Sequence, residues 1–199
     1  MKNKAVLLSI RPNYCFYIME QKKNVEIRKN RPSIETPFKC YIYCTKETSR
    51  DLVIKDGHGY FFQKIPCKVR DGMTESYIAN GTVIGEFICD RIEYLNMDSE
   101  GIFIQGNVYL EELGLDACLS YKDVMNYTKG KRPYGWHISN LKIYDKPKEL
   151  REFRKACPNK AEYCSRCGWR RTCDNQCANP ALILKRPPLS WCYVEEVCE

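Results

Sequence analysis

The sequence predicts an α+β fold, a small and partly closed β-barrel with helices at its rim. Many short segments are rich in β-branched and aromatic residues and end near Gly, Pro or Asn, whereas few segments have helical periodicity. Strands are expected at residues 5–10, 24–28, 38–44, 82–94, 135–144 and 190–194. No apolar run approaches the roughly 20 residues that span a bilayer, so no membrane partner is expected.

Two helices are expected between these strands. Pro12 suits the first turn of a helix that runs to Gln21. Ser120 and Asp123 have the spacing of a capping box and should begin a second helix to about Thr128. The helices are therefore expected to be short and to flank the strands.

The chain is expected to form one barrel domain, residues 1–150, followed by a cysteine-rich segment with a closing strand, residues 151–199. Residues 45–80 have the least regular pattern and are expected to form loops or an excursion. Gly85, inside the strand expected at 82–94, allows a bulge or a close approach of two backbones.

The charge favours a polyanionic partner. The formal net charge is +7, and the last quarter of the chain is more basic for its length than the rest. Lys and Arg that neutralise phosphates release condensed counterions, which favours nucleic acid; the alternative is an ordinary solvated basic surface. The N-terminal residues lack the longer apolar segment of a secretory signal, so a cytoplasmic location is expected.

A metal site is expected in the cysteine-rich segment. The chain has 13 cysteines, an odd number, and a Cys-x-x-Cys pair, which favours reduced thiols and metal over disulfides. Zinc prefers four soft ligands in a tetrahedron, and the expected ligands are Cys164, Cys167, Cys173 and Cys177, with Cys157 as the alternative. An iron–sulfur cluster would use the same ligands, and reduced thiols without metal are the other interpretation.

A second group of chemically distinctive residues lies near the N-terminus. Ser9 and Arg11 precede the first helix, and the pattern Lys23-x-x-Glu26-x-Arg28 enters the second strand. The cations could hold phosphate, and the carboxylate could accept hydrogen bonds from a base edge or orient the cations. The alternative is an ordinary solvated strand face whose ion pairs add little stability.

These residues also carry a resemblance to a known family. The chain begins much as ASCH domains do, with SIRPNYCFYIMEQKKNVEIRKNRP at residues 9–32. ASCH domains belong to the PUA-like superfamily and have a turn reading roughly Gly-x-Lys-x-x-Glu-x-Arg, whose last three positions match Lys23, Glu26 and Arg28; Gln21 replaces the usual Gly. Residues 134–150 and 185–194 resemble ASCH proteins of phage and prophage type.

The resemblance implies a PUA-like mixed β-barrel with a cleft beside the Lys-x-x-Glu-x-Arg strand, which accepts RNA or a single, modified nucleobase. Some ASCH proteins are amidohydrolases that act on an acylated cytidine, with a nucleophilic Thr at the position of Glu26 and a carboxylate ahead of the later helix, where this chain has Asp116. Because Glu26 has no hydroxyl, that chemistry is not expected here.

The leading hypothesis is a module that binds RNA or single-stranded nucleic acid through Ser9, Arg11, Lys23, Glu26 and Arg28. Tyr134 and Trp136 are candidates for a stacking platform, although Trp136 could equally belong to the core. The alternative is a ribonuclease that uses Lys23, Glu26 and His137 as acid–base groups. A third possibility is a mobile-element accessory protein that binds a host protein through the cysteine-rich face.

Overall fold

The protein is described by a computed structural model, which covers residues 4–55, 59–64, 76–98, 100–104, 108–157 and 179–197. This part is mostly sheet, with two α-helices, α1 (Pro12–Met19) and α2 (Tyr121–Thr128). Within it, neither helix is long and apolar enough to cross a membrane. The α+β class is as predicted, but the strands form separate sheets, and the described residues do not form a closed barrel.

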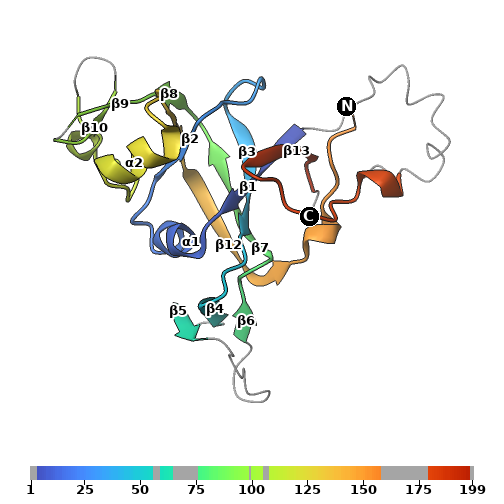
Figure 1. Cartoon of the computed structure of the whole chain (residues 1–199). Coiled ribbons are helices and arrows are strands. Elements are labelled where there is room, and N and C mark those ends of the chain that lie inside the picture. Colours follow the sequence, from blue (N-terminus) through green and yellow to red (C-terminus); the bar gives the residue numbers. More distant parts are fainter. Residues whose placement is uncertain are drawn as a thin grey trace.

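The largest sheet has five strands in the order β12-β7-β3-β1-β13 (Figure 1). Their bounds are Ser139–Lys148 for β12, Val83–Cys89 for β7, Phe38–Cys44 for β3, Lys4–Ile10 for β1 and Trp191–Glu195 for β13. The central strands β1 and β3 are parallel, and the other pairs are antiparallel. The strands expected at 5–10, 38–44 and 190–194 are confirmed.

Both faces of this sheet are buried because alternate side chains of its strands enter two different cores. Val6 and Leu8 pack with helix α1 on one face, whereas Ala5 and Leu7 pack with Phe153 on the other. The apolar run of β1 is therefore continuous, as expected for a strand that is covered on both sides.

A three-stranded sheet, in the order β2-β11-β8, lies beside the first. Its strands are β2 (Val25–Arg28), β11 (Tyr134–His137) and β8 (Ile92–Tyr94). The single strand expected at 82–94 is thus two strands, β7 and β8, and the one expected at 135–144 is β11 and β12. In both cases the chain leaves one sheet and enters the other, so the apolar pattern continues while the pairing partner changes.

The described residues between 45 and 80 form an excursion, as expected, but with strands of their own. A second three-stranded sheet has the order β5-β4-β6, with β4 at Arg50–Lys55, β5 at Gly59–Lys64 and β6 at Ser76–Ile78. Helix α1 contacts it through the ring of Phe16, whose centroid lies 5.5 Å from that of Phe62. In Figure 1 this small sheet projects from the rest of the molecule.

Helix α2 covers the face of the β2-β11-β8 sheet that carries Val25 and Ile27. The predicted capping box is present: Ser120 accepts from the backbone N–H of Asp123, whose side chain accepts from the N–H of Ser120. Val124 packs against Val25 and Ile27 of β2. Two short strands, β9 (Asn96–Met97) and β10 (Ile102–Phe103), pair next to α2.

The end of the chain returns to the main sheet. A 3₁₀ turn at Leu150–Glu152 leads to Arg154, which forms a bridge with Ile183 after a further turn at Pro180–Leu182. Strand β13 then pairs antiparallel with β1. The predicted C-terminal segment, residues 151–199, thus contributes an edge strand to the sheet of the N-terminal part.

Candidate functional site

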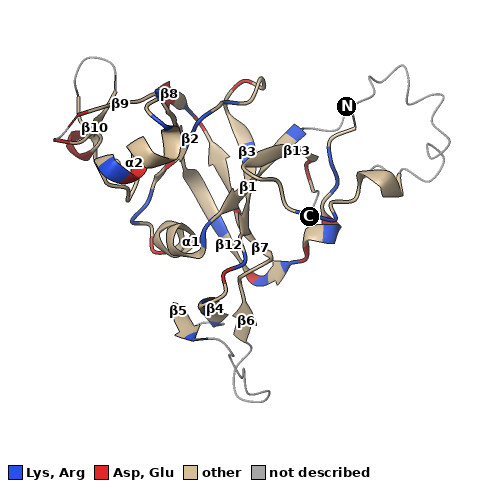
Figure 2. Cartoon of the chain, in the orientation of Figure 1, with Lys and Arg blue, Asp and Glu red and all other residues tan. Residues whose placement is uncertain are grey.

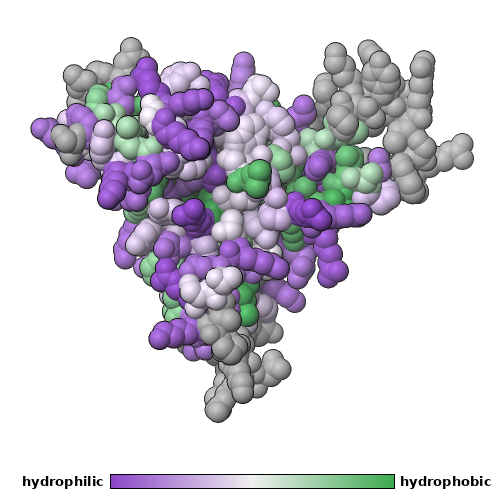
Figure 3. Space-filling model, viewed as in Figure 1, coloured by the Kyte–Doolittle hydropathy of each residue, from purple (hydrophilic) through white to green (hydrophobic). Residues whose placement is uncertain are grey.

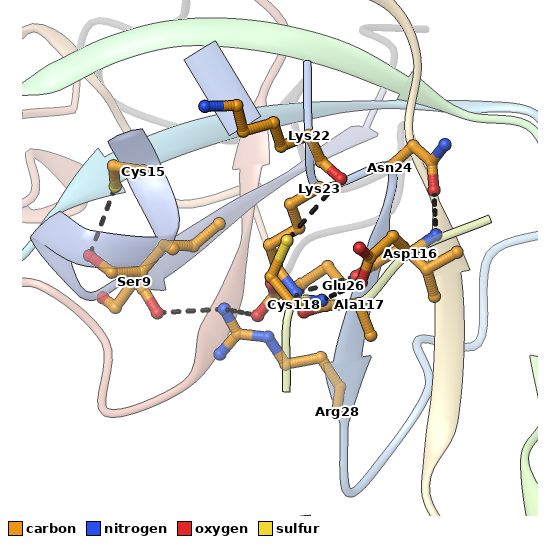
Figure 4. Close-up of polar contacts among 12 residues, drawn as sticks. Ser9, Cys15, Lys22, Lys23, Asn24, Glu26, Arg28, Asp116, Ala117 and Cys118 are labelled. Carbon is orange, nitrogen blue, oxygen red and sulfur yellow. Dashed lines mark hydrogen bonds and ion pairs between the residues drawn. The ribbon is translucent and has the colours of Figure 1, made fainter. Parts of the chain in front are cut away.

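The three ionic side chains that the sequence singled out do converge. Glu26 Oε2 lies 3.3 Å from Lys23 Nζ, and Glu26 Oε1 lies 3.0 Å from Arg28 Nη2 (Figure 4). Lys23 lies just before β2, whereas Glu26 and Arg28 are two residues apart on it and share a face. One carboxylate therefore bridges two cations, and we call these three residues the ionic cluster.

Lys23 is held entirely inside the protein. Its ammonium donates to the carbonyl oxygen of Val25 at 2.8 Å and to that of Ala117 at 2.5 Å. The ring of Tyr14, from α1, has its centroid 5.4 Å from the same nitrogen. With these partners and Glu26, the ammonium has no exposed surface.

Arg28 ties β2 to two distant segments. Its Nη2 donates to the carbonyl oxygen of Ser9 in β1 at 2.9 Å, and its Nη1 lies 3.2 Å from both the carbonyl and hydroxyl oxygens of Ser190. Only its Nε has no hydrogen-bond partner among the described residues. The guanidinium therefore joins β2, β1 and the loop before β13.

The ionic cluster does not line the open cleft that the sequence led us to expect. The exposed fractions of the Lys23, Glu26 and Arg28 side chains are 0%, 9% and 6%. The alternation of charged and apolar residues in β2 shows that the strand has a charged face. It cannot show that segments more than 90 residues away along the chain cover this face. In this structure the cluster is a buried link between segments.

Ser9 and Arg11, the other two residues of this group, differ in burial. Ser9 is half-buried, and its hydroxyl donates to the carbonyl oxygen of Pro188 at 2.6 Å. Arg11 is exposed at the N-terminus of α1. Ser9 therefore belongs with the buried link, and Arg11 alone of the five is a free surface cation.

His137 lies on the opposite face of its sheet from Glu26. In the register of β11 and β2, Trp136 is opposite Glu26 and His137 is opposite Val25. Its Nε2 lies 2.9 Å from Glu93 Oε2, and its Nδ1 lies 3.2 Å from Arg91 Nη2. The structure thus does not assemble Lys23, Glu26 and His137 into one acid–base group.

The environment of His137 favours its neutral form. Burial lowers the pKa of the imidazole, and Arg91 adds to this shift, whereas Glu93 opposes it. Because a guanidinium only donates, Nδ1 accepts and Nε2–H donates to Glu93. Both ring nitrogens are therefore engaged by the protein.

The two aromatic candidates differ in accessibility. Trp136 has no exposed surface and belongs to the core beside Phe38 and Trp191, so it offers no stacking surface. Tyr134 is half-buried, and its ring stacks on that of Tyr94, with centroids 4.3 Å apart and planes at 34°. Of this pair, Tyr94 is the outer ring and is 52% exposed.

Tyr94 and Tyr134 lie at one end of the β2-β11-β8 sheet. Tyr94, Tyr134 and Arg28 are partners in register across β8, β11 and β2. The Tyr134 hydroxyl donates to that of Tyr94 at 2.5 Å, which raises the pKa of Tyr134. The guanidinium of Arg132 lies over the Tyr94 ring, 5.3 Å from its centroid.

A second cation–aromatic contact flanks the same sheet end. Lys29, the residue after β2, has its ammonium 4.8 Å from the ring centroid of Tyr127 in α2. Tyr127 is 37% exposed. We define the strand-end surface as Lys29, Arg31, Tyr94, Tyr127, Lys129, Lys131, Arg132 and Tyr134.

The strand-end surface is strongly basic. Five of its residues are Lys or Arg, all of them exposed, and neither 29–31 nor 129–132 contains an acidic residue. Figure 2 shows Lys and Arg positions next to β2 and β8, and Figure 3 shows hydrophilic residues over α2 and β8. Exposed tyrosines among cations suit stacked bases and phosphates.

The predicted metal ligands lie mostly outside the described residues. Cys164, Cys167, Cys173 and Cys177 are not among them, whereas Cys157 is a half-buried free thiol. Within the described ranges, no three His, Cys, Asp or Glu residues are grouped as metal ligands. The zinc or iron–sulfur site therefore stays a prediction.

The fold and these sites define a mixed α+β protein with a buried ionic cluster and a basic, aromatic strand end. No family model matches the chain, and no curated protein does either. Among solved structures, it is similar to the ASCH protein from Zymomonas mobilis, at 16% identity and a TM-score of 0.43, over 94% of this chain and 85% of that one. A single-residue variant of that protein matches over 74% of this chain and 77% of that one, at 17% identity and a TM-score of 0.46.

Two basic runs in the sequence are a signal for the strand-end surface. Lys129-Gly-Lys131-Arg132 comes directly before the strand of Tyr134, and Lys29-Asn-Arg31 comes directly after β2. The antiparallel pairing of β2 and β11 brings the end of one strand next to the start of the other. Two basic runs at such positions predict one basic surface.

Proposed function

We propose that the chain binds single-stranded nucleic acid, with RNA as the expected form, and that contact is made at the strand-end surface. The observation that carries the proposal is the exposed Tyr94–Tyr134 stack with the Arg132 guanidinium over its outer ring. Aromatic rings and guanidinium planes are the groups on which unpaired bases stack. Lys29, Arg31, Lys129 and Lys131 supply charge for the phosphates.

In this proposal the ionic cluster acts indirectly. Arg28 is the register partner of Tyr134, and it is fixed by Glu26 and by Ser9 of β1. The cluster thus holds the strand end that carries the aromatic ring. Lys23 and Arg28 are not proposed to contact phosphate, because their charged groups are already bonded inside the protein.

The ribonuclease alternative has less support from the geometry. Its three expected acid–base groups are divided between the two faces of the β2-β11-β8 sheet. Lys23 is sealed, and His137 has partners on both ring nitrogens. A general base must reach the proton that it abstracts.

The test is a binding titration of labelled single-stranded RNA, measured by fluorescence anisotropy at several salt concentrations. If about three to five phosphates are neutralised, the logarithm of the association constant should fall with the logarithm of salt with a slope of about −2 to −3.5. Replacing Tyr94 by Ala should weaken binding by about 5- to 150-fold, because one stacked base contributes about 1–3 kcal/mol.

The control is Tyr17→Ala, which removes a tyrosine of α1 that is exposed too, at 37% against 52% for Tyr94. It should bind RNA as the unmodified chain does. Binding that does not change with salt, or equal losses from Tyr94→Ala and Tyr17→Ala, would contradict the proposal. RNA cleavage that His137→Gln abolishes would favour the enzyme instead.

A further inference from the structure

A pocket of about 570 Å³ opens beside the strand-end surface. Its walls come from the chain after β8, from β10 and from α2, which lie together in Figure 1. The apolar part of the lining is Leu95, Met97, Phe103 and Met125. This volume is within the range of pockets that enclose small organic ligands, about 300–1,000 Å³.

The side chains of Asn96, Tyr121 and Arg132 bring polar groups into the lining. Arg132 is the one charged residue that lines the pocket among those described. Asn96 also lines it, and its side-chain amide has no hydrogen-bond partner in the described part of the chain. An amide offers both a donor and an acceptor, the combination that reads a base edge.

Arg132 connects the pocket with the strand-end surface. It lines the pocket, and its guanidinium also lies over the ring of Tyr94. A nucleic-acid strand whose bases stack at Tyr94 would therefore pass the mouth of the pocket. A base next to the stacked one could leave the strand and enter.

A neighbouring hollow shows why this pocket is the better candidate. That hollow, of about 450 Å³, is lined in part by Glu100, Glu111, Glu112 and Asp116. Four carboxylates would repel a phosphate backbone. The pocket at Arg132 has four apolar side chains and a cation, and no carboxylate among its described lining residues, which suits a flat base attached to an anionic chain.

We propose that the pocket formed by Leu95, Asn96, Met97, Phe103, Met125 and Arg132 binds one unstacked nucleobase of a single strand, an inference that rests on the proposed function. The apolar side chains contact the faces of the base, Asn96 hydrogen-bonds its edge, and Arg132 lies toward its phosphate. Extruded bases are commonly held between apolar or aromatic side chains and read by hydrogen bonds in this way.

The test uses the full chain with ¹³C-labelled methionine methyl groups, titrated by NMR with AMP, GMP, CMP and UMP. These ligands contain a base without a polynucleotide backbone. The signals of Met97 and Met125 should shift with at least one of them, while that of Met19, the buried last residue of α1, should not. Asn96→Ala should weaken this binding by about three- to tenfold, the effect of one hydrogen bond.

A matched pair of helix variants tests the location. Met125→Trp should fill the pocket and abolish mononucleotide binding, whereas Asn126→Trp places the same ring on an exposed neighbouring position of α2 and should leave it unchanged. Mononucleotides that leave Met97 and Met125 unshifted, or that bind Asn96→Ala and Met125→Trp as they bind the unmodified chain, would overturn the inference. If salt-dependent RNA binding persists in that case, only the pocket fails; if it is absent throughout, the proposed function fails.

Discussion

At the scale of single residues, the ionic cluster shows how burial changes what a charged motif does. An exposed ion pair contributes little stability, because water and salt screen it. Lys23, Glu26 and Arg28 are instead removed from water, so each charge depends on the others. The cluster is therefore more sensitive to the loss of one member than a surface pair would be.

Replacing Lys23 by Met should lower the free energy of unfolding by about 3–5 kcal/mol, because the buried Glu26 loses one of its two cationic partners and two carbonyl oxygens lose the ammonium that donates to them. Urea unfolding followed by tryptophan fluorescence measures the loss. Lys22→Met is the control: Lys22 is 62% exposed and lies 3.9 Å from Glu20, so the expected change is within about 0.5 kcal/mol. Similar values for the two variants would show that the cluster is not a structural link.

The depressed pKa of His137 predicts a stability that depends on pH. The folded state favours neutral imidazole, so the unfolded chain binds more protons as the pH falls below about 6.5, its ordinary pKa. Stability from this residue is thus present above that pH and is lost on acidification. The difference in unfolding free energy between the unmodified chain and His137→Gln should shrink from pH 7.5 to pH 5.5. A difference that grows over this range would show that His137 is protonated in the fold.

At the scale of elements, the local patterns predicted individual strands better than their partners. The strands at 38–44 and 190–194 were placed correctly because their apolar runs are bounded by turn residues. The breaks after Cys89 and at Ile138 were missed, since the residues on both sides have similar apolar character. What changes there is the sheet that accepts the backbone hydrogen bonds: His137 N–H donates to the carbonyl oxygen of Arg91 at 3.0 Å.

Gly85 was predicted to allow a bulge or a close approach, and the structure has both. The register between β3 and β7 shifts next to it, and a Cβ atom at Gly85 would lie 2.5 Å from the carbonyl oxygen of Lys142 in β12. Gly85→Ala should therefore cost about 1–3 kcal/mol of stability, because the backbone of β12 must move.

Gly101→Ala is the comparison for this substitution. Its Cβ atom would approach only the ring of Tyr109, at 3.2 Å, and a side chain can move aside more easily than a central strand. Its cost in thermal unfolding should be the smaller of the two. If Gly85→Ala were as stable as the unmodified chain, β7 and β12 would not be in the close contact described.

At the scale of the whole molecule, the sequence predicted that Lys23, Glu26 and Arg28 come together, but it did not predict that they are buried. The Lys-x-x-Glu-x-Arg residues do meet, as their spacing indicated, yet the turn at Ala117 and the loop at Ser190 cover them. Ala117 lies 94 residues after Lys23 and Ser190 lies 162 residues after Arg28, and no local pattern reports the position of segments so far along the chain. The surface that remains accessible is the sheet end, where two basic runs are brought together by strand pairing.

The cysteine-rich segment allows a last prediction, which concerns how the molecule would respond to metal removal. The residues before and after this segment are joined by backbone hydrogen bonds that involve no cysteine. Lys155 N–H donates to the Leu182 carbonyl oxygen at 2.8 Å, and Leu184 N–H donates to that of Phe153 at 2.9 Å. We expect about one zinc ion per chain, held as Cys₄, and expect a chelator to remove it while the core stays folded.

Elemental analysis before and after chelation measures the metal, and the near-ultraviolet circular dichroism of buried Trp136 reports the core. Replacing Cys164 and Cys167 together by Ser should abolish zinc binding. Cys192→Ser should retain it, since Cys192 is in β13 and paired with Leu7 of β1. Zinc loss in Cys192→Ser, or an iron signal in place of zinc, would contradict this ligand set or this metal. Collapse of the Trp136 signal on chelation would show that the hydrogen bonds across Phe153 and Leu184 do not hold this end of the molecule by themselves.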